Sequence, residues 1–203
     1  MNQELIVLAS ASPRRRQLLD QIGVAFQVQP VAVDESRFDK EAPADFVRRI
    51  ALAKATDAWR VADGAAGRLV IGADTTVSLG ETVLGKPRDE EEARGMLRTL
   101  SGQTHDVTTA VAAVQEAERA VRVSSSKVTF RALTAAEIAA YVLTGEPLDK
   151  AGAYGIQGLA AVFVERLEGS YSGVMGLPLF ETAGLLRDFG LDVLSAGGPR
   201  IPG

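Results

Sequence analysis

Short, almost wholly apolar runs and longer alternating runs follow one another along the chain. The short runs are typical of strands buried on both faces of a sheet, and runs with a period of two are typical of antiparallel strands. A Gly80-Glu81 dipeptide between two runs has the Gly-X pattern of a two-residue hairpin turn. The predicted strands cover residues 4–9, 26–31, 69–73, 76–79, 107–114, 120–130 and 159–166. The hairpin strand that returns after residues 76–79 reaches Leu84.

Apolar residues that recur every three or four positions predict helices between these strands. Ser12 before Pro13 is a helix start signal, and Thr134 with Glu137 has the spacing of a capping box. Lys54 interrupts the apolar stripe of one helix. The predicted helices cover residues 13–22, 44–61, 89–100, a segment that opens at 134, and 178–189.

The alternation of the two patterns predicts the α/β class, with helices flanking a mixed sheet. The sequence contains no internal repeat and no long linker. We therefore expect residues 1–194 to form a single α/β domain, divided into two lobes by the central hairpin. The last residues, 195–203, have the composition of a flexible tail.

Composition removes several classes of protein. A net charge of −4 argues against a protein that coats nucleic acid, which needs a broad basic surface. The absence of cysteine excludes thiolate metal sites and cysteine nucleophiles, and the single histidine, His105, has no G-x-S-x-G elbow to accompany it. Apolar runs are too short for a signal peptide or a membrane span, so we expect a cytoplasmic protein with no membrane partner.

A basic turn, residues 10–16, follows the first predicted strand. Three arginines occupy the first turn of a helix, where the helix dipole makes each cation cost roughly 0.3–1 kcal/mol. Backbone N–H groups at this end, the guanidinium groups, and the hydroxyls of Ser10 and Ser12 would together hold phosphate. The alternative is a solvated basic helix end. The spacing differs from that of a Walker A loop.

Acidic residues follow two of the predicted strands. Asp74 stands at the end of one strand, where a carboxylate needs a metal or a hydrogen-bond partner, so it is a candidate general base or Mg²⁺ ligand. An Asx-type turn cap is the alternative. Asp34 and Glu35 would complete an all-oxygen Mg²⁺ site if their loop returns to the same sheet edge; otherwise they are ordinary loop acids.

Two lysines are candidates for neutralising phosphate charge. Lys54 lies on an inward helical stripe, and Lys86 lies in the turn LGKP. Snorkelling of Lys54 to solvent and simple exposure of Lys86 are the alternatives. A lone histidine such as His105 is more often structural than catalytic, so it takes no part in the expected chemistry.

Several motifs in fixed order resemble the Maf family of nucleotide pyrophosphatases: LASASPRRRQLL, GADTTV, LGKP, LSGQTHDVTTAV, EPLDKAGAYGIQG and GLPL. The resemblance implies a Maf/Ham1-like (ITPase-like) fold with an elongated mixed sheet and a cleft between two lobes. It also implies cleavage of a nucleoside triphosphate to the monophosphate and pyrophosphate with a divalent cation (Mg, Mn or Co), and a homodimer. The resemblance further implies a house-cleaning role, which would keep non-canonical nucleotides out of nucleic acid.

The resemblance also assigns site residues. Asp74 matches the family's proton acceptor, and the positions lining its phosphate and metal site are matched by Ser10, Arg15, Glu35, Lys54 and Lys86. The subgroup resembled most acts on dTTP and UTP, and its three specificity positions are matched by Arg14, Thr75 and Gln157. A glutamine amide can both donate and accept, as uracil requires.

Two alternatives stay open. One is a pyrophosphatase for a modified or non-standard purine nucleotide such as 7-methyl-GTP or ITP. The other is a nucleotide-binding regulator of cell division, in which hydrolysis is incidental.

Overall fold

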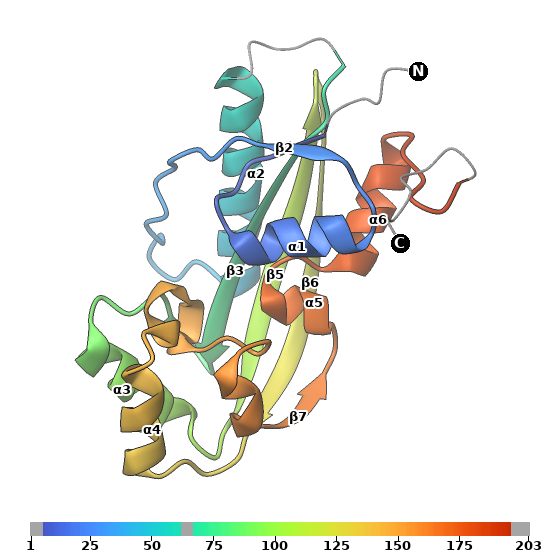
Figure 1. Cartoon of the computed structure of the whole chain (residues 1–203). Coiled ribbons are helices and arrows are strands. Elements are labelled where there is room, and N and C mark those ends of the chain that lie inside the picture. The colour runs from blue at the N-terminus through green and yellow to red at the C-terminus, as the bar shows by residue number, and fades with distance from the viewer. Residues whose placement is uncertain (1–5, 62–66, 196–203) are drawn as a thin grey trace. The chain divides into compact units, whose positions relative to one another are not determined.

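The computed structural model describes residues 6–61 and 67–195 and has the expected mixed α/β composition (Figure 1). The described strands are β1 (Ile6–Leu8), β2 (Phe26–Val28), β3 (Val70–Leu79), β4 (Thr82–Leu84), β5 (Thr104–Gln115), β6 (Glu118–Phe130) and β7 (Val164–Glu168). The α-helices are α1 (Pro13–Gln21), α2 (Pro43–Val61), α3 (Glu90–Leu100), α4 (Ala135–Val142), α5 (Tyr171–Met175) and α6 (Leu179–Asp188). Short 3₁₀ helices are η1 (Glu146–Asp149), η2 (Ala151–Ala153) and η3 (Leu159–Phe163).

The strands form a mixed sheet in the order β2-β1-β3-β5-β6-β7, with β4 paired to β3. Strand β1 pairs in parallel with both β2 and β3. The β3–β4 and β6–β7 pairs are antiparallel. Gly80 opens the predicted two-residue hairpin turn with a φ of 58°, which a glycine adopts at little cost. The prediction of a mixed sheet is therefore confirmed.

The chain divides into two compact units. Unit 1 comprises residues 1–74, 109–124 and 176–203, and unit 2 comprises residues 75–108 and 125–175. None of the described helices combines the length and the hydropathy that a bilayer span requires.

In unit 1, helix α2 packs closely against β3. A Cβ added to Gly72 of β3 would lie 2.4 Å from the carbonyl oxygen of Ala51 and 2.7 Å from the nitrogen of Ala55. Only glycine allows this approach of the two backbones. Small residues therefore fill the contact: Ala51, Ala55 and Ala58 are fully buried.

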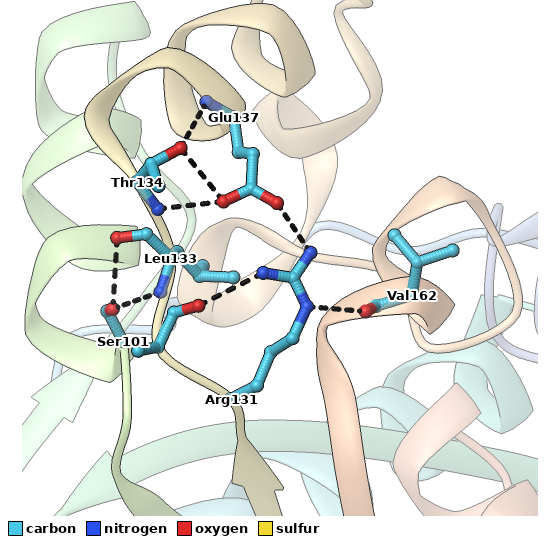
Figure 2. A network of polar contacts seen from close by, with 7 residues as sticks. Ser101, Arg131, Leu133, Thr134, Glu137 and Val162 are labelled. Atoms are coloured by element: carbon cyan, nitrogen blue, oxygen red, sulfur yellow. Dashed lines mark hydrogen bonds and ion pairs between the residues drawn. The ribbon is translucent and has the colours of Figure 1, made fainter.

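Unit 2 has an aromatic core. Phe130 meets the ring of Tyr154 edge to face at 4.8 Å, and Tyr141 meets Phe163 in the same way at 5.2 Å. The N-terminus of α4 is fixed beside this core by the predicted capping box, in which Thr134 and Glu137 bond reciprocally (Figure 2).

Two strand predictions are wrong. Strand β3 continues without a break through Asp74, so this carboxylate lies in the strand interior and not at a strand end. The predicted strand 159–166 begins as the 3₁₀ helix η3, and only β7 is extended. Ala160 and Phe163, both buried, are three positions apart, which is the spacing of a 3₁₀ turn.

The predicted helix starts are confirmed to within one residue. The capping bond expected of the first helix is absent. Ser12 is the N-cap residue of α1, but its side chain makes no cap hydrogen bond. Helix α5 was not expected, because its five residues are too few to show a helical period. The predicted tail lies outside the described residues except for Ser195.

Candidate active site

The basic turn lies between β1 and α1 in unit 1. Ser10 is buried, and its hydroxyl accepts a hydrogen bond from the backbone N–H of Ser12 at 3.2 Å. Arg15 donates from Nη1 to the same hydroxyl at 3.2 Å and from Nε to the carbonyl of Gly176 at 2.8 Å. Arg15 is therefore held by both ends of its guanidinium group.

Lys54 connects two carboxylates of unit 1. Its Nζ lies 2.8 Å from Oδ1 of Asp74 and 2.5 Å from Oε1 of Glu35. The side chains of Lys54 and Asp74 are only 12% and 11% exposed, whereas that of Glu35 is 49% exposed. The snorkelling alternative for Lys54 is therefore wrong, because its ammonium group lies in an ion-pair cluster. The Asx-cap alternative for Asp74 does not fit a residue inside a strand.

Burial and the neighbouring charges act on the pKa of Asp74 in opposite directions. Burial raises the pKa of this carboxyl above its ordinary value, while the nearby Lys54 and Arg15 lower it and Glu35 raises it further. Burial lowers the pKa of Arg15, against the attraction of Asp74. A raised pKa makes a carboxylate a better proton acceptor, which is the property that a general base requires.

Arg49 of α2, which no sequence motif predicts, holds the loop that carries Glu35 against this helix. Arg49 forms a fork with Glu41, Nε to Oε1 and Nη2 to Oε2 both at 2.7 Å, and Nη2 also donates to the carbonyl of Ser36 at 2.9 Å. Its guanidinium carbon lies 4.0 Å from the centroid of the Phe38 ring. An arginine at a polar position of a predicted helix is normally expected to be solvated, so the sequence pattern does not indicate these contacts of Arg49.

The other candidate acid of this loop has a local role. Oδ1 of Asp34 accepts the backbone N–H of Ser36 at 2.9 Å, as in an Asx turn. Hydrogen bonding with Ser36, through its side chain first and its backbone second, lowers the pKa of Asp34. Across the described residues, no three or more His, Asp or Glu side chains group in a way that could hold a metal ion. The carboxylates that gather at Lys54 are the pair Glu35 and Asp74.

Three predicted site residues belong to unit 2. Lys86 is exposed in the segment after β4, and Gln157 is exposed between η2 and η3. Thr75 follows Asp74 in β3 and is half-buried. Arg14 is half-buried in the basic turn of unit 1, and Arg16 is exposed.

His105 lies in the aromatic core of unit 2. It is 1% exposed, its Nε2 is 2.8 Å from the hydroxyl of Tyr154, and its ring meets Phe130 edge to face. Its Nδ1 is buried with no hydrogen-bond partner among the described residues. Burial lowers the pKa of His105 to about 4, so the ring is neutral at physiological pH. This placement fits the structural interpretation of the residue.

Comparison with known proteins agrees with the motif pattern. The Maf family profile, described as Maf-like protein, matches residues 5–189. A protein of Alkalilimnicola ehrlichii named dTTP/UTP pyrophosphatase is 56% identical over 190 residues, which are 92% of this chain and 94% of that protein. A protein of Hahella chejuensis with the same name is 50% identical over 190 residues, 94% of each chain.

Among solved structures, the Staphylococcus aureus Ham1 protein matches with a TM-score of 0.39 and 14% identity, over 62% of this chain and 71% of that one. The family profile spans nearly the whole chain. The two relatives are identical to this chain at half or more of the aligned positions. The chain belongs to the Maf family.

Proposed function

We propose that this chain is a nucleoside triphosphate pyrophosphatase that hydrolyses dTTP and UTP to the nucleoside monophosphate and pyrophosphate. The names of the relatives supply the reaction and the substrates. The observation that carries the proposal is a buried carboxylate, Asp74, whose neighbours are the cationic groups of Lys54 and Arg15. A site of this kind can activate water while it neutralises a polyanion.

In the proposed reaction, Asp74 takes a proton from a water molecule as the water oxygen attacks the α-phosphorus. The bond from the α-phosphorus to the oxygen that bridges to the β-phosphorus breaks, and pyrophosphate leaves with the electron pair. Lys54 and Arg15 stabilise the charge that develops on the phosphate oxygens. Because both cations are fixed by hydrogen bonds before substrate arrives, little reorganisation is needed.

Two carboxylates support the proposal that the site holds a divalent cation. Glu35 and Asp74 place carboxylate oxygens around one positive charge, the Lys54 ammonium, and hard oxygen ligands are those that Mg²⁺ and Mn²⁺ prefer. These two residues would hold the ion. When bound, it would neutralise phosphate charge as a Lewis acid.

The remaining residues of the proposed site bind and select the substrate. Ser10 and Ser12 would contact phosphate oxygens from the basic turn, and Lys86 would add a third cationic group. Arg14, Thr75 and Gln157 would select the pyrimidine base. The support for Lys86, Thr75 and Gln157 is their match to the family motifs. Arg14 is supported by the same match and by its place in the basic turn, and Ser12 by its place in the turn alone.

The cellular role follows from the reaction. Removal of triphosphates before polymerisation would keep modified pyrimidine nucleotides out of nucleic acid. We further propose that the protein acts in the cytoplasm as a homodimer, without a nucleic-acid or membrane partner. Light scattering on the purified protein tests the dimer directly.

The test of the proposed reaction is pyrophosphate release from a panel of nucleotides with Mg²⁺, Mn²⁺ or Co²⁺. We expect dTTP and UTP to be cleaved fastest, and chelation of the cation to stop turnover. Faster cleavage of 7-methyl-GTP or ITP would replace the substrate assignment. Tight binding of nucleotide without turnover would favour the cell-division regulator.

A further inference from the structure

Gln157 of unit 2 is the exposed centre of a short loop whose two ends are tied to one pair of side chains. The backbone N–H of Gly155, two residues before it, donates to the hydroxyl of Tyr141 at 3.3 Å. The backbone N–H of Leu159, two residues after it, donates to Oε2 of Glu146 at 3.0 Å. The loop is thus hydrogen-bonded to Tyr141 and Glu146 at positions two residues before and two residues after Gln157.

The two supporting side chains are themselves joined. The Tyr141 hydroxyl donates to Oε1 of Glu146 at 2.8 Å, so the Glu146 carboxylate binds a hydroxyl with one oxygen and a backbone amide with the other. Tyr141 is 4% exposed on α4. Burial and this carboxylate raise the pKa of Tyr141, so the phenol stays protonated and keeps its donor.

Close packing leaves the loop little freedom. A Cβ on Gly158 would lie 2.3 Å from Oε1 of Glu146, and a Cβ on Gly155 would lie 2.8 Å from Cε of Lys150. Gly158 also donates its N–H to the carbonyl of Gly155 at 2.9 Å, which closes a turn around Gln157. A side chain at either position would therefore displace the end of the Glu146 or Lys150 side chain.

The far side of the loop is anchored separately. Arg131 donates from Nε to the carbonyl of Val162 at 3.1 Å and forms an ion pair with Glu137 at 2.7 Å (Figure 2). This network holds η3 against α4. The hydrogen bonds of Arg131 go to Val162, Ala132 and Glu137 and not to residues 155–159, so this network provides a matched control.

We infer that Tyr141 and Glu146 are positioning residues for nucleotide selectivity, which they control by fixing the loop that presents Gln157. The inference rests on the proposed function, in which Gln157 reads the base. An amide that must donate and accept at fixed points of a pyrimidine loses its discrimination when its loop moves, and ordering a mobile loop costs binding free energy. The pair would therefore act on substrate choice without touching substrate.

The test uses the full-length protein with Tyr141→Phe, Glu146→Gln, Gln157→Ala and both double variants with Gln157→Ala. We measure kcat and KM for UTP, CTP and GTP. Loss of one hydrogen bond is expected to raise KM for UTP about threefold to tenfold and to lower the UTP/CTP and UTP/GTP ratios of kcat/KM, with kcat within about twofold. The control, Glu137→Gln, is expected to keep both ratios.

A double-mutant cycle separates positioning from general stabilisation. If Tyr141 and Glu146 act through Gln157, their substitutions change selectivity no further once Gln157 is alanine. Full additivity in the cycle, or unchanged selectivity of both single variants, overturns the inference. Tyr141→Phe removes one oxygen only, so it carries the test if Glu146→Gln does not fold.

Failure of the proposed function looks different. A wild-type protein that cleaves UTP and dTTP no faster than CTP and GTP overturns the function itself, and the inference with it. A selective wild type with normal variants overturns only the positioning roles. Amide hydrogen exchange of residues 154–160, faster in Glu146→Gln than in Glu137→Gln, is the expected structural readout.

Discussion

The ammonium nitrogen of Lys54 lies 2.8 Å from Oδ1 of Asp74, although the two residues come from a helix and a strand 20 positions apart. The contact exists because α2 lies directly on β3, where Gly72 has no side chain to separate them. Lys54 lies between Ala51 and Ala55, on the turn of α2 that crosses Gly72, and its side chain reaches the carboxylate from there. The pair is thus a product of backbone packing as much as of charge.

Substitution of Asp74 by Asn is expected to abolish pyrophosphate release, with kcat lower by about 10²–10⁴-fold, because the amide accepts no proton from water. The wild-type rate is expected to fall as pH decreases through the raised pKa of Asp74, since only the ionised form is a base. The measurements are a pH–rate profile and the variant's kcat. Asp57→Asn, on the exposed part of α2, is the control and keeps normal activity.

The same substitution is expected to leave stability at neutral pH equal or higher. The folded-state pKa of Asp74 lies above its ordinary value, so ionisation costs folding free energy as pH rises through that raised pKa. Asparagine removes this cost and can still accept from Lys54. Thermal unfolding at pH 5 and pH 8 tests the sign; a variant much less stable at pH 8 would contradict it.

Arg49→Lys is expected to reduce kcat/KM about tenfold or more while lowering stability only modestly. Lysine keeps the charge but loses the fork to Glu41 and the stack on Phe38, so the loop that carries Glu35 is released. Arg60→Lys is the matched control, because Arg60 lies on the same helix in an exposed pair with Asp57. Steady-state kinetics and thermal unfolding of both variants provide the check; equal kinetics for the two would refute the positioning role of Arg49.

Gly72→Ala and Gly95→Ala are expected to change stability in opposite directions. The added methyl at Gly72 meets the backbone of α2, so we expect a loss of about 2 kcal/mol or more together with lower activity, since Lys54 shifts relative to Asp74. At Gly95, inside α3, a Cβ meets nothing within 4 Å, so helix propensity is expected to add about 0.5–1 kcal/mol. Urea unfolding of both variants measures the difference. A Gly72→Ala variant with wild-type stability and activity would contradict the prediction, because it would show that α2 can move away from the added methyl group.

His105→Gln is expected to make the protein less sensitive to acid. The folded-state pKa of His105 is about 4 against an ordinary 6.5, so its stabilising effect is complete above pH 6.5 and is lost as pH falls toward 4. The loss amounts to up to about 3 kcal/mol. Glutamine can bond to Tyr154 but does not titrate. Unfolding free energies at pH 7.5 and 4.5 should therefore differ less for the variant than for the wild type, and an equal difference would count against this account.

Local patterns predicted much of the fold because each predicted element carries its own signal. The capping box at Thr134 and the turn at Gly80 depend on residues within four positions of one another, and both are confirmed. The 3₁₀ helix η3 was missed because five residues with an apolar composition fit a strand equally well. What decides between them is the burial of Ala160 and Phe163, which depends on packing in unit 2.

Residue chemistry and family motifs predicted the charged residues of the candidate site but not the residues that support them. They selected Ser10, Arg15, Glu35, Lys54 and Asp74, which the structure gathers in unit 1. They did not select Arg49, since its importance lies in contacts with Glu41 and Phe38 that no periodicity encodes. Supporting residues of this kind become visible only when the loop path is known.

The two carboxylates that share Lys54 differ in what each would lose by moving. Asp74 is part of an uninterrupted strand, and displacing it would break the pairing of β3 with its neighbours. Glu35 stands on a loop, and 49% of its side chain is exposed. Lys54 therefore joins one carboxylate that the sheet holds in place to one that solvent reaches.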